Sequence, residues 1–413
     1  MNTSTCKILL VIVVLMAPGL QETALAQESP QGRQESGDVP VEVVLDMLSA
    51  VPLDALPGEL VLYADMRVAE RRAGFRAVTS ERAWRRLENA GRSADWVLAL
   101  PFGVPRGLTD GFLRAQTGME SFVGFSFLDA DRTVSFGAPP AQGVVVDGRF
   151  GQARIEEALE KRGYSLTSSV SGVIWCGPGG CNSGTEIDLE NRNLGNPFGG
   201  SLGQNHIVGF VGGRVVASPS FDTVNGALDT YTGVADGRGE SLAGVDAVQA
   251  AFEAVADDYT VRSALIGDEA TIFGTESSAG ALPSNDAAGT GIGDFASDII
   301  VISDLVPTDS ARHRAQITLC YNDQSAAEGA AQELQRRLAT AEVTAAPQDT
   351  GLSGLLAQMG QYGAEATVAD VVAHQATELW LVTVGFASSA DAASTVYNAV
   401  INRLLRRDLQ WLR

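Results

Sequence analysis

Short apolar strands and amphipathic helices follow one another irregularly along the chain from about Asp38 onward. Strands are expected at 60–64, 96–100, 121–128, 144–146, 207–211, 215–217, 315–321 and 379–386. Helices are expected at 80–90, 153–162, 221–231, 245–256, 325–340 and 390–405. A doubly wound sheet requires regular alternation of strand and helix, which is missing. The pattern therefore predicts an α+β fold in which helices pack on mixed sheets.

One segment divides this pattern into two parts. Residues 267–297 are rich in Ser, Ala, Gly, Asn and Asp, and they carry five acids and no base. Such a composition is typical of a linker between domains or of a long surface loop. We therefore expect two α+β domains, at 38–266 and 298–413, with the acidic segment between them.

Three strand–loop–helix units stand out, at 144–162, 317–338 and 379–405. The first two end in similar charged helices, Glu-Ala-Leu-Glu-Lys-Arg at 157–162 and Glu-Leu-Gln-Arg-Arg at 333–337. This similarity suggests a duplicated unit, although a match of this length does not establish a repeat.

The first 26 residues have the three parts of a secretory signal peptide. Lys7 provides the positive charge, residues 8–17 are an unbroken apolar run, and Ala24-Leu25-Ala26 fits a cleavage site. An uncleaved membrane anchor is the alternative, but ten apolar residues are far fewer than the roughly 20 that a spanning helix needs. We expect export, with a mature chain that begins at Gln27, and a flexible polar tail at 27–37.

Export to an oxidising compartment affects whether the cysteines form disulfides. Cys176 and Cys181 lie in Cys-Gly-Pro-Gly-Gly-Cys, and in an oxidising compartment we expect them to form a disulfide that closes the turn. Two free thiols are the alternative, and a zinc site would need two further ligands that the sequence does not offer nearby. Cys320 is expected to be a buried structural thiol.

A resemblance accompanies this layout. With its signal sequence, Leu-Pro-Gly-Glu-Leu at 56–60, Gly163-Tyr164 and Val173-Ile174-Trp175, the chain resembles bacterial secreted proteins and lipoproteins of unknown function. The resemblance implies an exported envelope protein with repeated α+β units, and it assigns no functional residues. The residue directly after Ala26 is Gln27 and not a cysteine, so the lipid attachment of many such proteins is not expected.

The sequence offers few candidate residues for several common kinds of catalysis and metal binding. The mature chain has one lysine, Lys161, and it lacks a phosphate-binding loop. His206, His313 and His374 are isolated, and no pair has the spacing of metal ligands on a helix. We predict neither a cofactor nor a metal.

Two motifs leave a hydrolase open as an alternative. Ser201 is the centre of Gly199-x-Ser-x-Gly203, which matches a nucleophile elbow, but no strand precedes it and no helix follows it. Asp222 and His313 could complete a catalytic triad with Ser201 only if the fold brought them next to it. Carboxylates at 129 and 131 could form an acid–base pair, and those around Asp188 could bind calcium, although turns explain both groups.

Arginine is the least ordinary feature. The formal net charge of −21 excludes a generally basic nucleic-acid binder, yet residues 67–92 hold eight arginines and three glutamates. We interpret this segment as a candidate surface for an anionic partner, formed by Arg71, Arg72, Arg76, Arg82, Arg85 and Arg86. The plainer interpretation is a solvated helix face. A second basic stretch at 403–413 could lie on a membrane or pack as a terminal helix.

The sequence therefore predicts an exported, non-catalytic binding or accessory protein of the cell envelope. Its ligand is unspecified, and its partner would be another envelope protein or an anionic surface rather than a nucleic acid. The alternatives are a secreted hydrolase that uses Ser201 or paired carboxylates, and a peripheral protein held at a membrane by its basic segments.

Overall fold

A computed structural model describes residues 41–413 with gaps at 73, 76–77, 116–117, 236–239, 256–258, 269–270, 273–298, 309–311, 342–350, 369–370, 375, 390–392, 407–411 and 413. All described residues belong to one compact unit, which begins at Asp38. The predicted signal peptide and tail lie outside the described residues.

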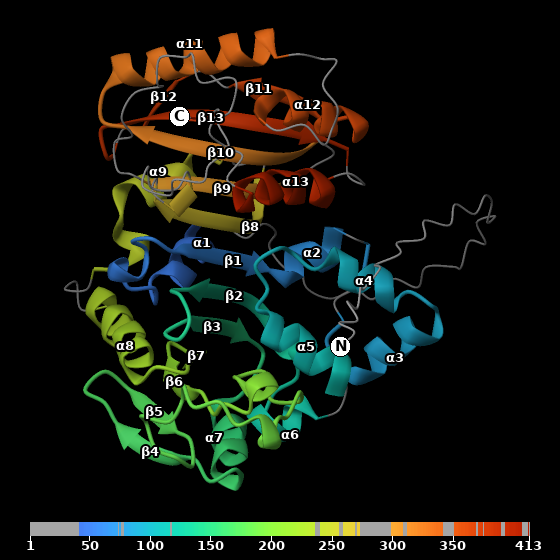
Figure 1. The fold of residues 1–413 in the computed structure, drawn as a ribbon, viewed down its shortest axis with the longest axis vertical. Coiled ribbons are helices and arrows are strands. Elements are labelled where there is room, and N and C mark those ends of the chain that lie inside the picture. Colours follow the sequence, from blue (N-terminus) through green and yellow to red (C-terminus); the bar gives the residue numbers. More distant parts are fainter. Residues whose placement is uncertain are drawn as a thin grey trace, which may run out of the picture. The chain divides into compact units, whose positions relative to one another are not determined.

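Thirteen strands in the described part of the chain form one sheet, and every pair of neighbours is antiparallel (Figure 1). The strands of the first half are β1 (Leu60–Asp65), β2 (Ala130–Phe136), β3 (Gly143–Gly148), β4 (Ser165–Ser168), β5 (Val173–Cys176), β6 (Ile207–Val211) and β7 (Arg214–Ser218). The second half contributes β8 (Tyr259–Asp268), β9 (Ile299–Pro307), β10 (His313–Tyr321), β11 (Glu365–Val368), β12 (Val372–His374) and β13 (Leu379–Ser388). The order is β11-β13-β10-β9-β8-β1-β2-β3-β7-β6-β5-β4, and β12 also pairs with β13.

The expected α+β class is confirmed, but the mixed sheets that we expected are one antiparallel sheet. Strand β8 lies before the acidic segment and β9 lies after it, and the two pair from Tyr259 opposite Pro307 to Asp268 opposite Ile299. The segment that we expected to be a linker between domains or a long surface loop therefore connects adjacent strands of the same sheet. Most of it, residues 273–298, lies outside the described residues.

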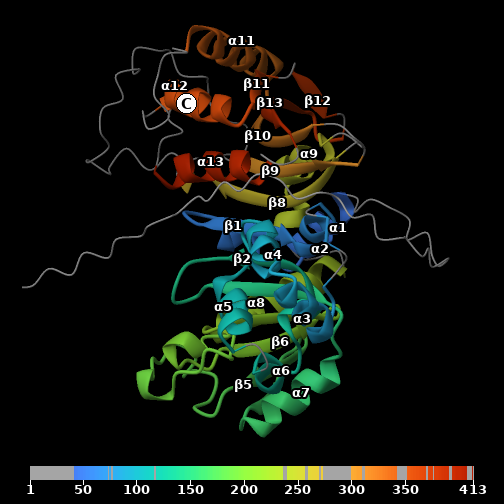
Figure 2. The ribbon, with the colours of Figure 1, turned by 90° about the vertical axis from the view of Figure 1, so that its right-hand side faces the viewer.

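Helices cover both faces of the sheet. The face that carries Val134 and Val301 packs against α1 (Val41–Leu48), α8 (Phe221–Ala235) and α9 (Asp246–Glu253). On the opposite face, the first half of the sheet packs against α2 (Met66–Arg72), α3 (Glu81–Asn89), α4 (Ser93–Ala99), α5 (Arg106–Ala115), α6 (Met119–Val123) and α7 (Gln152–Lys161). The second half of that face packs against α11 (Gln324–Thr340), α12 (Gly351–Gln361) and α13 (Ala393–Leu405). Figure 2 looks onto the side with α2 to α5 and α13.

One hydrophobic core extends across the predicted boundary. Helix α9 precedes the acidic segment, yet it packs on β9, β10 and β13, which follow it. The thiol of Cys320 is buried, as expected, and its Sγ lies 3.5 Å from the carbonyl oxygen of Ala247 in α9. Burial of apolar surface therefore joins the two halves as directly as the strand pairing does.

The two halves share a topology. Three consecutive strands form a meander, a helix follows, and a later strand pairs with the third strand of the meander. In the first half these elements are β1, β2, β3, α7 and β7, and in the second half they are β8, β9, β10, α11 and β13. The two helices with similar charged ends are thus topologically equivalent, and they pack on the same face of the sheet.

Candidate functional site

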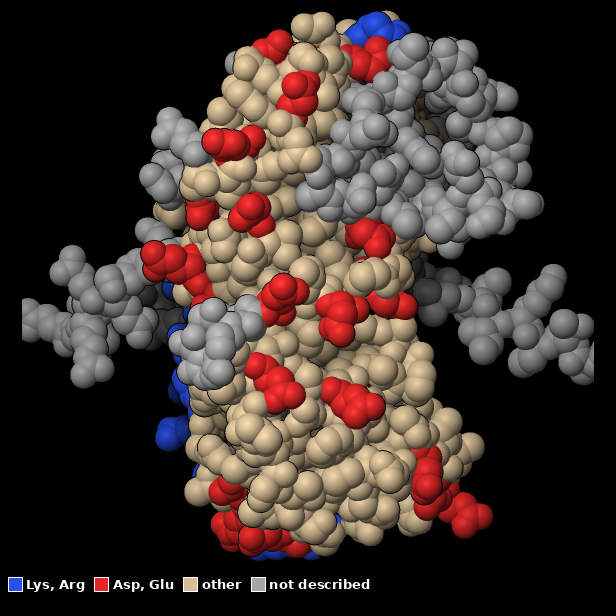
Figure 3. All heavy atoms as spheres, turned by 90° about the vertical axis from the view of Figure 1, so that its left-hand side faces the viewer, with Lys and Arg blue, Asp and Glu red and all other residues tan. Residues whose placement is uncertain are grey.

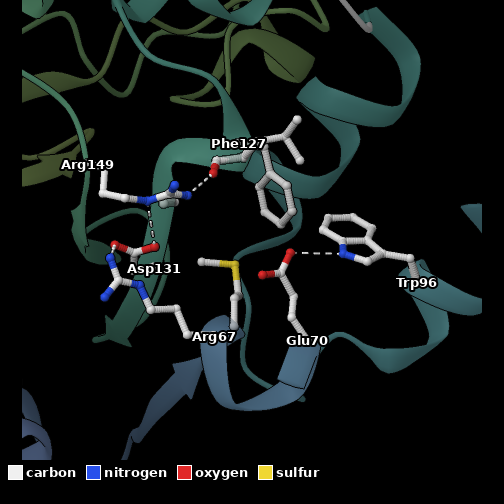
Figure 4. A pocket seen from close by; sticks show the side chains of 9 residues that line it. Arg67, Glu70, Trp96, Phe127, Asp131 and Arg149 are labelled. Atoms are coloured by element: carbon white, nitrogen blue, oxygen red, sulfur yellow. Dashed lines mark hydrogen bonds and ion pairs between the residues drawn. The ribbon is translucent and has the colours of Figure 1, made fainter. Parts of the chain in front are cut away.

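A small pocket lies where α2 leaves the end of β1. Its walls come from α2, α4 and the chain around β2, and it is lined by Met66, Arg67, Glu70, Trp96, Phe127, Leu128, Ala130, Asp131 and Arg149 (Figure 4). These residues come from four separate segments of the first half, namely α2, α4, the chain around β2 and the residue after β3, so only the folded chain brings them together.

Two guanidinium groups meet one carboxylate in this pocket. Arg67 forms an ion pair with Asp131, and Arg149 Nε donates to Oδ1 of the same carboxylate at 3.2 Å. Arg149 also donates to the carbonyl oxygen of Leu128. The Asp131 side chain is 5% exposed, whereas those of Arg67 and Arg149 are 42% and 37% exposed. The buried carboxylate is therefore compensated, and both arginines keep contact with solvent.

Glu70 forms the inner wall of the pocket. Its Oε1 accepts hydrogen bonds from Trp96 Nε1 at 3.0 Å and from the backbone N–H of Val78 at 3.1 Å. The residue is only 9% exposed, and burial raises the pKa of its carboxyl group, although the hydrogen bonds from Trp96 and Val78 oppose this effect. Trp96 is itself held in an aromatic cluster, edge-on to Phe127 and Trp84.

The candidate arginines from the sequence do not line this pocket. Arg82, Arg85 and Arg86 are exposed on α3, and Arg71 is exposed on α2. Arg85 pairs with Glu81 one turn earlier, while no ion pair is found for Arg82 or Arg86 within the described residues. The side chain of Arg72 and the whole of Arg76 lie outside the described residues. The arginines of α3 thus face solvent rather than a cleft.

The arginines of the pocket were partly missed. Arg67 falls within the basic segment, but Arg149 lies far from it in sequence, after β3. No local pattern marks Arg149, because its role follows from the pairing of β2 with β3.

The expected disulfide is present. Cys176 and Cys181 are bonded, with their Cα atoms 4.8 Å apart, and the bond closes the turn that follows β5. A disulfide of this kind persists in oxidising compartments, so it is compatible with a location outside the cytoplasm.

Ser201 lies in a short 3-10 turn, Gly200–Leu202, and is exposed. A loop rather than a strand precedes it, so the strained elbow of a hydrolase is not formed. Asp222 lies in the first turn of α8 and His313 begins β10, so both belong to other elements of the fold. His206 is the nearby histidine, and it packs against Gly199, where a Cβ atom would lie 2.5 Å from its ring.

The other candidate carboxylates have structural partners. Asp188 accepts backbone hydrogen bonds from Glu190 and Asn191, and Asp129 caps a 3-10 turn by accepting from the N–H of Ser126. Within the described residues, no group of three or more His, Cys, Asp or Glu side chains is arranged to hold a metal ion.

Of the basic C-terminal stretch, Arg403 is buried at the end of α13 and Arg406 is exposed, while 407–411 and 413 lie outside the described residues. Among the described helices, none has the length and apolarity that crossing a membrane requires.

Charge is segregated between the two sides of the sheet. Helices α1, α8 and α9 each carry two acids and no base: Glu42, Asp46, Asp222, Asp229, Asp246 and Glu253. Figure 3 shows the left-hand side of Figure 1, where these helices are labelled, and acidic side chains are scattered over it while basic ones stay at its margins. Arginine instead gathers on α2 and α3 on the opposite face.

Comparisons with known proteins give little. No protein-family model and no curated protein matches the chain. A search of solved structures found "Structure of crystal form III of TP0453", with a TM-score of 0.32 and 8% identity, covering 85% of this chain and 97% of that chain. A similarity this weak supports no conclusion about this protein.

Proposed function

We propose that this protein is an exported, non-catalytic binding or accessory protein of the cell envelope, which docks an acidic partner protein on the arginines of α3. The observation that carries the proposal is the exposure of Arg82, Arg85 and Arg86 on one short helix, with a single ion pair among them. Guanidinium groups bind carboxylates in a two-pronged geometry, so such a row suits an acidic protein surface.

The charge of the whole chain favours a localised contact. With a net charge of −21 the protein repels acidic partners in general, whereas the arginine side of α2 and α3 attracts them. The acids of α1, α8 and α9 face the other side of the sheet, so a partner is oriented as it approaches.

The test uses the mature chain from Gln27 and poly-L-glutamate as the probe. Binding is measured at low and high salt for the natural chain, for R82Q/R85Q/R86Q, and for the matched control R106Q/R192Q/R336Q, which removes three exposed arginines elsewhere. We expect salt-sensitive binding that the α3 variant weakens on the order of a hundredfold, because each of its three lost charge-assisted contacts costs on the order of 1 kcal/mol. The control should bind as the natural chain does.

Three results would overturn the proposal. Equal loss in both variants would mean that only the total charge matters. Binding to phosphatidylglycerol vesicles without binding to poly-L-glutamate would indicate a membrane-surface protein instead. Turnover of an ester, peptide or glycoside that Ser201→Ala abolishes would contradict the non-catalytic part.

A further inference from the structure

Two arginines and two carboxylates line the pocket beside α2, and at its mouth both arginines contact the same carboxylate, Asp131. Arg67 and Arg149 share Asp131, which leaves an excess of one positive charge when Glu70 is neutral. A guanidinium has five N–H donors. Arg67 uses one of them and Arg149 uses two in hydrogen bonds to described residues, so most of these donors remain for a ligand.

Among the residues that the structure describes, Glu70 is anchored through one of its two oxygens. The hydrogen bonds from Trp96 and Val78 both reach Oε1, and the other oxygen points away from Trp96, toward the side of the pocket that holds Asp131 and the two arginines (Figure 4). When protonated, a carboxyl group held in this way can donate a hydrogen bond from Oε2. When ionised, it repels another anion.

We propose that this pocket binds the head group of a small organic anion, a carboxylate, between Arg67, Arg149 and the free oxygen of Glu70. The hollow has a volume of about 10 Å³, the space of roughly one water-sized sphere, so one carboxylate oxygen enters it and the rest of the anion stays at the mouth beside the partly exposed arginines. Met66 and Phe127 provide an apolar wall beside it. This site is separate from α3 and does not rest on the docking function proposed above.

Binding at this site is linked to protonation of Glu70. The charged and titratable groups that face it are Arg67 and Asp131 from α2 and β2 and Arg149 after β3, with Trp96 from α4 as a hydrogen-bond donor. Burial raises the pKa of Glu70, so the carboxyl group is neutral over a wider range than a solvated one. A bound anion favours the neutral form further, and its affinity falls as the pH rises.

The probe is trifluoroacetate, a carboxylate that stays ionised across the range from pH 4 to pH 8, followed by ¹⁹F NMR line broadening. Arg67→Gln removes one guanidinium and leaves Arg149 to compensate Asp131; we expect affinity to fall about tenfold. Glu70→Gln keeps the acceptor for Trp96 and Val78 and places a neutral donor at the other position. We expect this variant to bind more tightly than the natural chain at pH 8 and to lose the pH dependence.

Arg336→Gln and Glu328→Gln, both exposed on α11, are the matched controls. A purely structural role for Glu70 would predict no gain on Glu70→Gln, and that result overturns the proposal, as does binding that Arg67→Gln leaves unchanged or the absence of binding at any pH. Near-UV circular dichroism shows that each variant is folded. Displacement by phenylacetate alone identifies a free small acid, and displacement by a capped tetraglutamate peptide identifies a protein side chain; either supports the site.

Discussion

At the scale of single residues, burial and neighbouring groups shift the pKa values of side chains. Burial raises the pKa of Cys320 to about 12, so this thiol is inert in the core between β10 and α9. Glu333 shows the opposite effect, because hydrogen bonds from Arg336 and Arg337 lower its pKa to about 2. The Glu333 side chain is 16% exposed but that of Arg336 is 58% exposed, so the ion pair between them contributes little to stability.

His206 gives a prediction at this scale. Burial lowers its pKa from 6.5 to about 4, so the folded protein keeps the ring neutral while the unfolded chain takes up a proton below pH 6.5. Unfolding then binds a proton between about pH 4 and 6.5, and stability falls as the pH falls through this window. The loss should be on the order of 2 kcal/mol, because the ring keeps partial contact with water.

The measurement is urea unfolding at pH 7 and pH 4.5 for the natural chain and for His206→Gln. The variant should lose less stability between the two pH values, since glutamine does not titrate. An identical loss in both proteins would show that other groups carry the pH dependence.

At the scale of elements, sequence patterns predicted correctly those helices whose caps and apolar spacing lie within the helix itself. Helix 153–162 was expected and α7 is Gln152–Lys161; the helix that begins after Ser80 is α3, with the Ser80 hydroxyl accepting from the N–H of Ala83. Two expected strands are wrong: residues 96–99 of the strand expected at 96–100 belong to α4, and the strand expected at 121–128 is replaced by the end of α6 and the start of a 3-10 turn. Short apolar runs fit a strand and a buried helix equally well, and packing decides between them.

The disulfide is an element-scale prediction. The double substitution Cys176→Ser/Cys181→Ser opens the small ring that the disulfide closes beside β4 and β5, between cysteines five positions apart in the sequence. Loss of this small loop constraint should reduce the free energy of unfolding by about 2 kcal/mol. Urea unfolding measures it, and a reducing agent should bring the natural chain to the midpoint of the variant. No change in midpoint would mean that the turn is held by its hydrogen bonds alone.

At the scale of the whole molecule, the sheet and the core under α9 join the two halves. Leu381 lies on β13 and is 1% exposed, within the core that also contains Val134 and Tyr63 of the first half. Leu381→Ala should cost about 3 kcal/mol through lost apolar burial and the cavity left behind. Because the core is shared, we expect the first half to unfold at a correspondingly lower urea concentration.

Hydrogen exchange followed by mass spectrometry separates the halves. Under urea, amides of β2 and β3 should lose protection together with those of β10 and β13 in both the natural chain and Leu381→Ala. Protection of β2 and β3 that the substitution leaves unchanged would show that the halves unfold independently.

The sequence by itself determined the features that depend on neighbours in the chain. These are the mixed α+β class, the caps and turns, the disulfide between residues five apart, and the similar helices of α7 and α11. Tertiary structure alone decided that β8 and β9 continue one sheet, and that Arg67 and Arg149 meet at Asp131, 64 and 18 residues away. Strand pairing and ion pairing between distant segments depend on how the whole chain buries its apolar surface. Local periodicity therefore does not predict them.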